Sequence, residues 1–253
     1  DLSSFNTANV ENMSYMFEYC NKLNAIYASD KFTTSNVTSS NQMFYNCFSL
    51  SGDIAYDNKT YDKTYAKIVG GYFRDKAYAN RPWAKYADGT LTFKYGYKRT
   101  IDGSNGEYEL NSGANQPGWN EKSSSITKVV FDESFKDVRP TTGYMWFYNC
   151  YKLTEIENIS YLNTSEMTDM GSMFRNCNRL QSLDLSNFNT AKVKDMDYMF
   201  NWCETLQSLD LSNFNTAMVK EMNLMFANCS KLQSIIISKD FTTKSMKSDT
   251  YMF

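Results

Sequence analysis

Apolar side chains recur near both ends of the chain at an uneven but repeated spacing. Val193, Met196, Met199, Phe200 and Cys203 follow one another at steps of 3, 3, 1 and 3 residues. On an α-helix these steps place all five side chains on one face, so the spacing predicts an amphipathic helix of about three turns.

A short strand is expected after this helix. Leu209 and Leu211 flank Asp210, and an apolar–polar–apolar alternation places both leucines on the same side of an extended chain. Phe214 follows three residues later and is expected to close the unit at a turn. One unit is therefore predicted to run strand, turn, helix, turn.

This unit is repeated along the chain. The octapeptide LDLSNFNT occupies residues 183–190 and again residues 209–216, which lie 26 residues further on. Each of the six cysteines stands three residues after a phenylalanine, and successive cysteines within each end of the chain are 26 or 27 residues apart. A fixed period of this length is typical of a solenoid, in which a unit buries its apolar face only against its neighbours.

We therefore expect an α/β solenoid of 26–27-residue strand-turn-helix repeats of the leucine-rich-repeat kind, with a β-rich cap between two repeat arrays. The strands of successive repeats would form a parallel sheet. The residues expected to form the structural repeat core are Val10, Met13, Met16, Phe17, Cys20, Phe44, Cys47, Phe147, Cys150, Phe174, Cys177, Met196, Met199, Phe200, Cys203, Met222, Met225, Phe226 and Cys229.

The centre of the chain differs from both ends. Ten of the eleven glycines and all three prolines lie between Gly52 and Gly143, whereas all six cysteines lie outside the interior of that window. Glycine and proline mark turns, so the centre is expected to be turn-rich. Strands are expected at residues 90–95 and 126–131, and a short helix ended by glycine within residues 61–71.

These differences divide the chain into five parts. Residues 1–50 are expected to be the final repeats of a first solenoid, and residues 51–76 its exit cap. Residues 77–82 would form a joint and residues 83–145 the β-rich N-terminal cap of a second solenoid. Residues 146–253 would be repeats of that second solenoid. Because the order is repeats, cap, cap, repeats, we expect the chain to be a window cut from consecutive modules that continues beyond its end.

Composition narrows the possible functions. The chain has 253 residues, no histidine and a formal net charge of -2. Without histidine it lacks the commonest general base and the commonest metal ligand, so we expect no enzymatic activity, no catalytic or metal-binding residues and no cofactor. A net charge near zero argues against a nucleic-acid partner. No run of 18 apolar residues exists, so no membrane span is expected in this window.

The cysteines could form disulfides, bind a metal or remain free. Stacked positions about 5 Å apart would satisfy the Cα separation of a disulfide. Every cysteine, however, occupies the same inward slot of its repeat, so neighbouring side chains would point in parallel. No Cys-x-x-Cys pair is present to suggest a metal site. We therefore expect free, buried thiols.

Aromatic residues of the central cap are the candidate ligand-binding residues. Partly exposed tyrosine and tryptophan suit protein interfaces and stacking on sugars. The alternative is that these rings only pack the core of the cap. The candidates are Trp83, Tyr95, Tyr97 and Trp119.

The repeat also carries a family resemblance. LDLSNFNT followed by V-x-x-M-x-x-M-F-x-x-C-x-x-L resembles the BspA-like leucine-rich-repeat surface proteins of bacteria. Residues 88–93 and 126–132 resemble the N-terminal cap of that family, and residues 64–68 and 71–73 resemble its exit segment.

The resemblance implies a non-enzymatic protein that is extracellular or bound to the bacterial cell surface. Such a protein would act as an adhesin or protein-interaction scaffold, with host matrix proteins or other cell surfaces as partners. One alternative is a structural stalk or filament of modules that associate end to end. A second alternative is a carbohydrate-binding module that uses the cap aromatics.

Overall fold

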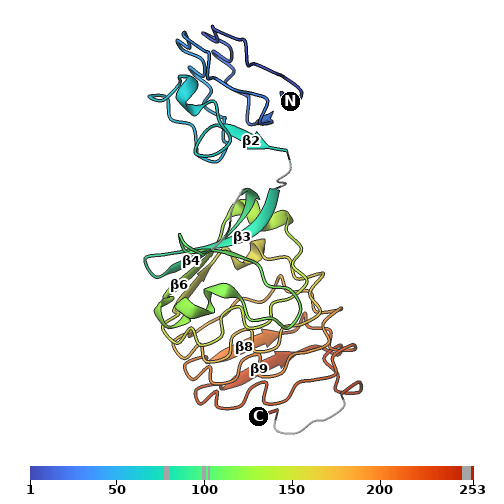
Figure 1. Cartoon of the computed structure of the whole chain (residues 1–253). Helices are drawn as coiled ribbons and strands as arrows, with labels where there is room; N and C mark the ends of the chain where they lie inside the picture. The colour runs from blue at the N-terminus through green and yellow to red at the C-terminus, as the bar shows by residue number, and fades with distance from the viewer. Residues whose placement is uncertain (77–79, 99–100, 102, 247–251) are drawn as a thin grey trace. The chain divides into compact units, whose positions relative to one another are not determined.

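The computed structural model describes residues 1–76, 80–98, 101, 103–246 and 252–253 (Figure 1). The chain forms two compact units. The first comprises Asp1–Arg81 with Gly96–Thr100, and the second comprises Pro82–Tyr95 with Ile101–Phe253. The division between Arg81 and Pro82 falls inside the predicted joint at 77–82, of which residues 77–79 lie outside the described residues.

The described part of the first unit up to Lys76 contains two short strands and one turn of 3-10 helix. Strand β1 (Ile26–Ala28) pairs in parallel with β2 (Phe73–Asp75). The helix η1 (Lys63–Tyr65) replaces the longer helix expected within residues 61–71, and the Asp62 side chain caps it by accepting a hydrogen bond from the Thr64 amide at 2.8 Å. The core of this unit centres on the fully buried Phe44, Cys47 and Tyr72.

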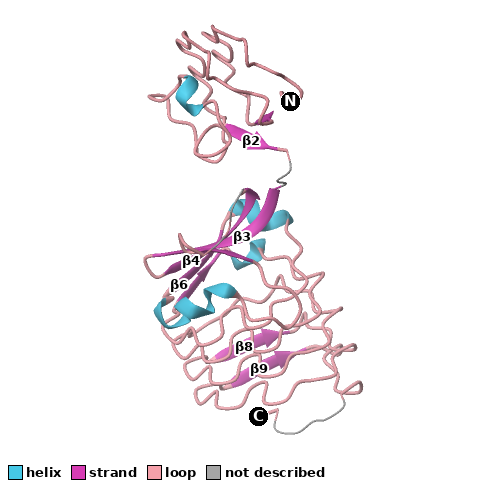
Figure 2. Ribbon diagram, in the orientation of Figure 1, coloured by secondary structure: helices cyan, strands magenta, loops and turns pink. Residues whose placement is uncertain are grey.

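The second unit begins with a five-stranded sheet in the order β5-β3-β4-β6-β7 (Figure 2). The two long strands are β3 (Asn80–Ala87) and β4 (Thr90–Tyr97), whose outer ends belong to the first unit. Strand β5 (Glu107–Glu109) is antiparallel to β3, whereas β6 (Lys128–Phe131) is parallel to both β4 and β7 (Glu155–Glu157). The strands expected at 90–95 and 126–131 correspond to β4 and β6.

Three 3-10 helices and a second small sheet complete this unit. The helices are η2 (Gly118–Ser125), η3 (Glu133–Asp137) and η4 (Ile159–Tyr161). Strands β8 (Ser208–Leu211) and β9 (Ser234–Ile237) are parallel, with Leu209 opposite Ile235 and Leu211 opposite Ile237. Figure 1 shows β8 and β9 side by side near the C-terminal end of the unit. Residues 26 apart in the sequence are therefore direct neighbours in this sheet.

Successive copies of the repeat lie next to one another in sequence order. Parallel bridges join Thr142 to Asp169, Asp169 to Asp195 and Asp195 to Glu221. The Phe200 ring lies between the rings of Phe174 and Phe226, which come from the preceding and the following copy. The ring centroids are 5.7 Å and 5.9 Å apart, and the interplanar angles are 5° and 4°. Each inward side chain thus packs on its equivalent in the next copy.

The helix predicted in each copy is wrong. Among the described residues the structure contains 3-10 helices but no α-helix. The segment from Met196 to Cys203 instead forms consecutive tight turns, in which the Met199 amide donates to Met196 O at 3.2 Å and the Cys203 amide donates to Phe200 O at 3.1 Å. Turns three residues long bring every third side chain to the same side, so they produce the apolar spacing that had indicated a helix.

Two left-handed residues in each copy explain why the helix does not form. Tyr198 and Trp202 have φ values of 58° and 61°, and residues at both equivalent positions in the other copies also have positive φ. A left-handed residue cannot continue a right-handed α-helix. The amides of Tyr198, Phe200 and Trp202 donate instead to the next copy, at 2.9, 3.0 and 3.0 Å. Part of the turn backbone is thus satisfied only by a neighbouring copy.

The predicted core residues are not buried equally. In the second unit Phe147, Cys150, Phe174, Cys177 and all those from Met196 to Phe226 are buried, and Cys229 is half-buried. In the first unit Met13, Phe44 and Cys47 are buried and Val10 and Phe17 are half-buried. Met16 is 39% exposed and Cys20 is also exposed, contrary to expectation. Both belong to the first described copy, against which one other described copy packs.

Candidate interaction surfaces

The predicted ligand-binding role of Trp119 is wrong. Its side chain is fully buried, and its indole Nε1 donates a hydrogen bond to Trp146 O at 2.7 Å. The ring meets Phe93 edge-to-face at 5.4 Å. A ring enclosed on all sides stabilises the cap and is inaccessible to a ligand.

The other three cap aromatics are less buried than Trp119. Trp83 is half-buried and lies 6.0 Å from the Lys94 ammonium, whereas Tyr95 is 39% exposed. Tyr97 belongs to the first unit, where its hydroxyl accepts a hydrogen bond from the Asp75 amide at 3.0 Å and its ring lies 5.2 Å from the Arg74 guanidinium. Of the four candidates, Trp119 is the one enclosed in the core, and the other three keep part of their surface exposed.

All six cysteines are free thiols. The Cys177, Cys203 and Cys229 thiols each donate to a phenylalanine carbonyl of the preceding copy, at 3.2, 3.2 and 3.0 Å. Burial raises the pKa of Cys150 to about 12 and that of Cys47 to about 11. These thiols are protonated at neutral pH and are therefore poor nucleophiles. Within the described ranges no group of three or more acidic or cysteine side chains is placed to hold a metal ion.

A column of carboxylates runs across successive copies of the second unit. Asp169, Asp195 and Glu221 occupy the same repeat position, as their parallel bridges show. The Oδ1 atoms of Asp169 and Asp195 both lie 3.2 Å from the point that a Cβ on Gly171 would occupy. Gly171 therefore leaves a small space into which two acidic side chains turn.

Electrostatics in this column are unfavourable to ionisation. The pKa of Asp195 is raised to about 6, mainly by burial. The charges of Asp169, Asp197 and Glu221 also raise this pKa, whereas the hydrogen bond from the Asp197 amide lowers it. Burial also raises the pKa of Asp169. The repeated acidic position at 26-residue steps is the sequence signal that could have revealed this column.

An arginine lies between aromatic rings beside these carboxylates. The Arg175 guanidinium is 5.6 Å from the Tyr148 ring and 4.5 Å from the Tyr198 ring, distances typical of cation–π contacts. The charges of Asp169 and Asp195 raise the pKa of the neighbouring Tyr144, after burial, whereas Arg175 lowers it. These groups stabilise adjacent copies, but they bring no nucleophile and base together.

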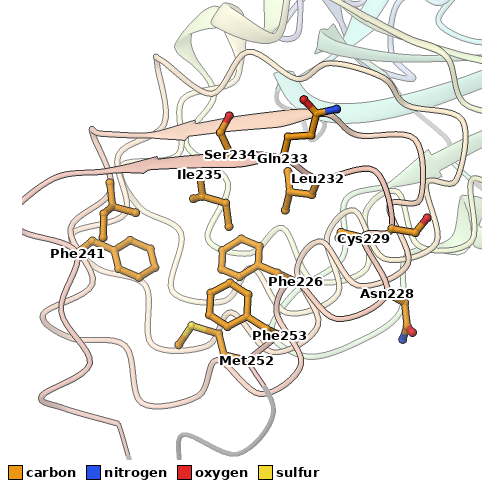
Figure 3. Close-up of a pocket in the computed structure, with 12 residues that line it drawn as sticks. Phe226, Asn228, Cys229, Leu232, Gln233, Ser234, Ile235, Phe241, Met252 and Phe253 are labelled. Carbon is orange, nitrogen blue, oxygen red and sulfur yellow. The ribbon is translucent and has the colours of Figure 1, made fainter.

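An apolar hollow lies beside β9 (Figure 3). Its volume is about 630 Å³, and its floor includes Phe226, Leu232 and Ile235. Phe253, which is 78% exposed, stacks on Phe226 at 5.5 Å. These are the inward positions of the last described copies, and no further described copy covers the hollow.

No helix among the described residues combines the length and apolar character needed to cross a bilayer. A solved structure of a leucine rich cell surface protein from Faecalibacterium prausnitzii A2-165 is similar at 20% identity and a TM-score of 0.32. The match covers 91% of this chain and 58% of that chain, so the present chain spans less than two thirds of that protein's length. At this TM-score the two backbones differ too much to establish a shared fold.

No curated protein matches this sequence. The family described as "Mycoplasma protein of unknown function, DUF285" matches residues 1–82 and 143–253. The matched ranges include every copy of the Phe-x-x-Cys repeat and leave out most of the cap between the two arrays. Because they make up well over half of the chain, this protein belongs to the DUF285 family.

Proposed function

We propose that this chain is a non-enzymatic cell-surface or secreted protein that binds extracellular proteins through a rigid repeat scaffold. The stacking of repeat copies 26 residues apart carries the proposal, since it directs apolar side chains inward and leaves a long polar surface for partners. The scaffold in this proposal is a solenoid of turns and short strands. The resemblance of its repeat to BspA-like surface proteins supports the location and the adhesive role.

Two further observations favour a scaffold over an enzyme. The thiols of the second unit are buried or half-buried and hydrogen-bonded to the backbone. The carboxylates with raised pKa lie in a column without a histidine, lysine or hydroxyl nucleophile bonded to them among the described residues. Such groups maintain the stack of copies.

A binding experiment tests the adhesive role. The purified chain would be titrated over immobilised fibronectin, laminin and type I collagen, with serum albumin as the negative control. Saturable binding near micromolar strength, about -8 kcal/mol, is expected for at least one matrix protein. Equal binding to albumin, or no saturable binding to any of the three, would overturn the proposal.

A structural stalk is the second candidate function, and the apolar face beside β9 favours it. Ile237, which lines the hollow on this face, is 55% exposed. The edge of β9 that no described strand pairs with can pair with another strand. Analytical ultracentrifugation would show concentration-dependent head-to-tail association if this face joins molecules. A monomer at all concentrations would exclude association of this chain through the face.

A further inference from the structure

We propose that the first unit holds a neutral oligosaccharide in a hollow between its two repeat copies and the segment that follows them. The hollow has a volume of about 510 Å³. It is distinct from the cap aromatics and from the face beside β9, and the proposal does not depend on the protein-binding role above. Its lining residues are Tyr15, Ser40, Asn41, Gln42, Tyr61 and Asp62.

Aromatic rings supply a surface for the sugar ring. Tyr15 is 55% exposed. Tyr61 packs edge-on against Tyr45 at 5.6 Å, and Tyr45 packs in the same way against Tyr19 at 5.7 Å. A tyrosine ring offers an apolar face on which the C–H face of a pyranose can stack, together with a hydroxyl that can hydrogen-bond at its edge. The contacts among Tyr19, Tyr45 and Tyr61 hold the Tyr61 ring in place. The Tyr15 ring remains accessible to a ligand.

Polar side chains with free hydrogen-bonding capacity surround these rings. In the part of the chain that the structure describes, no protein group hydrogen-bonds the side chains of Tyr15, Asn41, Gln42 or Tyr61. An amide side chain both donates and accepts, as does each hydroxyl of a sugar. The two amides that line the hollow can therefore hydrogen-bond to sugar hydroxyls.

The charge of the lining indicates a neutral ligand. Asp62 is the charged residue among those that line the hollow, and its Oδ1 already accepts the Thr64 amide. A carboxylate accepts hydrogen bonds from sugar hydroxyls but repels phosphate, sulfate and uronic-acid groups. A neutral hexose polymer therefore fits the hollow better than an acidic one.

The backbone around the hollow is fixed before any ligand binds. The Tyr15 amide donates to Asn41 O at 2.9 Å, the Asn41 amide donates to Ser14 Oγ at 3.2 Å, and the Phe44 amide donates to Tyr61 O at 3.0 Å. These bonds join all three segments of the lining. A preorganised site loses less conformational entropy on binding, so affinity can be gained from few contacts.

The test is isothermal titration calorimetry of the intact chain with three probes, cellohexaose, chitohexaose and hexagalacturonate. At least one of the two neutral probes is expected to bind with a Kd of about 0.1–1 mM, and the acidic hexamer at least about tenfold more weakly. Tyr15→Ser and Asn41→Ser should each weaken the neutral sugar at least about tenfold. Serine already stands at both repeat positions in other copies of this chain, because Ser172 is equivalent to Tyr15 and Ser14 is equivalent to Asn41.

Tyr198→Ser is the matched control, because Tyr198 has the same repeat position as Tyr15 but lies in the second unit. It should leave sugar binding unchanged. Circular dichroism melts would show that the variants fold, and Asn41→Ser decides the outcome if Tyr15→Ser is unstable. The proposal is overturned if no neutral hexamer binds, if the acidic hexamer binds as tightly, or if Tyr198→Ser weakens binding as much as the two site variants.

Discussion

Two copies of the same sequence frame have different environments in this molecule. In the copy at residues 193–203, Met199 and Cys203 are fully buried, whereas the equivalent Met16 is 39% exposed and Cys20 is also exposed. The side chains are the same and so is their spacing. Among the described residues, the later copy is contacted by copies on both sides and the earlier one by a copy on one side. Burial is thus a property of stacking and not of a single copy.

The largest expected difference between these copies concerns their phenylalanines. Phe200 is fully buried between two parallel rings at 5.7 and 5.9 Å, whereas Phe17 is half-buried and stacks on Phe44 alone at 5.4 Å. Phe200→Ala should lower the free energy of unfolding by about 3–5 kcal/mol, and Phe17→Ala by about 1–2 kcal/mol.

Urea denaturation would measure both effects. All four tryptophans lie in the second unit, so tryptophan fluorescence follows Phe200→Ala and far-ultraviolet circular dichroism follows Phe17→Ala. Equal losses of stability in the two variants would contradict the view that neighbours on both sides determine burial.

Thiol reactivity should separate the same copies. With a disulfide reagent at pH 8, Cys20 is expected to react at least about a hundredfold faster than Cys203, because a buried thiol must wait for local opening and burial raises its pKa far above its usual range. Mass spectrometry of the labelled peptides measures the two rates.

In denaturant all six thiols should react. Fewer than six would reveal disulfides and would contradict the hydrogen-bonded thiols described here. Comparable native rates at Cys20 and Cys203 would show that the later copy opens as readily as the first.

The carboxylate column gives a pH-dependent difference between buried and exposed acids. The folded-state pKa of Asp195, about 6, is above the ordinary value of 3.8. Its contribution to stability is therefore present below pH 4, declines as pH rises to about 6, and stays low above that. Asp195→Asn should raise the melting temperature at pH 7.5 and flatten the slope between pH 4 and 6. Solvent screening limits the gain to about 1 kcal/mol or less.

Asp210 provides a control of opposite sign. It is exposed on β8, and hydrogen bonds from Ser212 lower its pKa. Asp210→Asn should therefore slightly lower the melting temperature at pH 7.5. A decrease for both variants in differential scanning calorimetry would show that Asp195 acts chiefly through its bond to the Asp197 amide, 2.8 Å long.

The smallest effect is expected at the open strand. Ile237 is 55% exposed, whereas its partner in register, Leu211, is fully buried. Ile237→Lys should change the free energy of unfolding by no more than about 0.5 kcal/mol, as is usual for surface positions. Urea melts of the variant at low protein concentration measure it. A loss comparable to that of a core substitution would mean that β9 is covered in solution.

The period, the inward position of the cysteines and the parallel neighbours 26 residues apart could be predicted because they depend on residue identity at fixed steps. The tight turns could not be distinguished from a helix by apolar spacing alone. One signal was nevertheless present. Asn46, Asn149, Asn176 and Asn228 share the second left-handed position, and asparagine tolerates that conformation better than most residues. Tyr198 and Trp202 give no such indication.

The candidate sites were harder to predict for a different reason. Whether a tryptophan such as Trp119 packs a core or faces solvent depends on which segments cover it, and these are distant in sequence. The hollow at Tyr15 and Tyr61 likewise joins residues 46 apart from two repeat copies and a later segment. Spacing within one copy contains no information about such assemblies.

The hydrogen bonds between copies also have a mechanical consequence. The amides of Tyr198, Phe200 and Trp202 all donate to carbonyl groups of the following copy. The hydrogen bonds between two copies therefore run side by side, along the direction in which the copies stack. A load that separates two copies evenly must stretch these bonds together, whereas a pull on one end of the chain breaks them in turn. Resistance to force should therefore depend on where the molecule is held, which single-molecule pulling from different attachment points can measure.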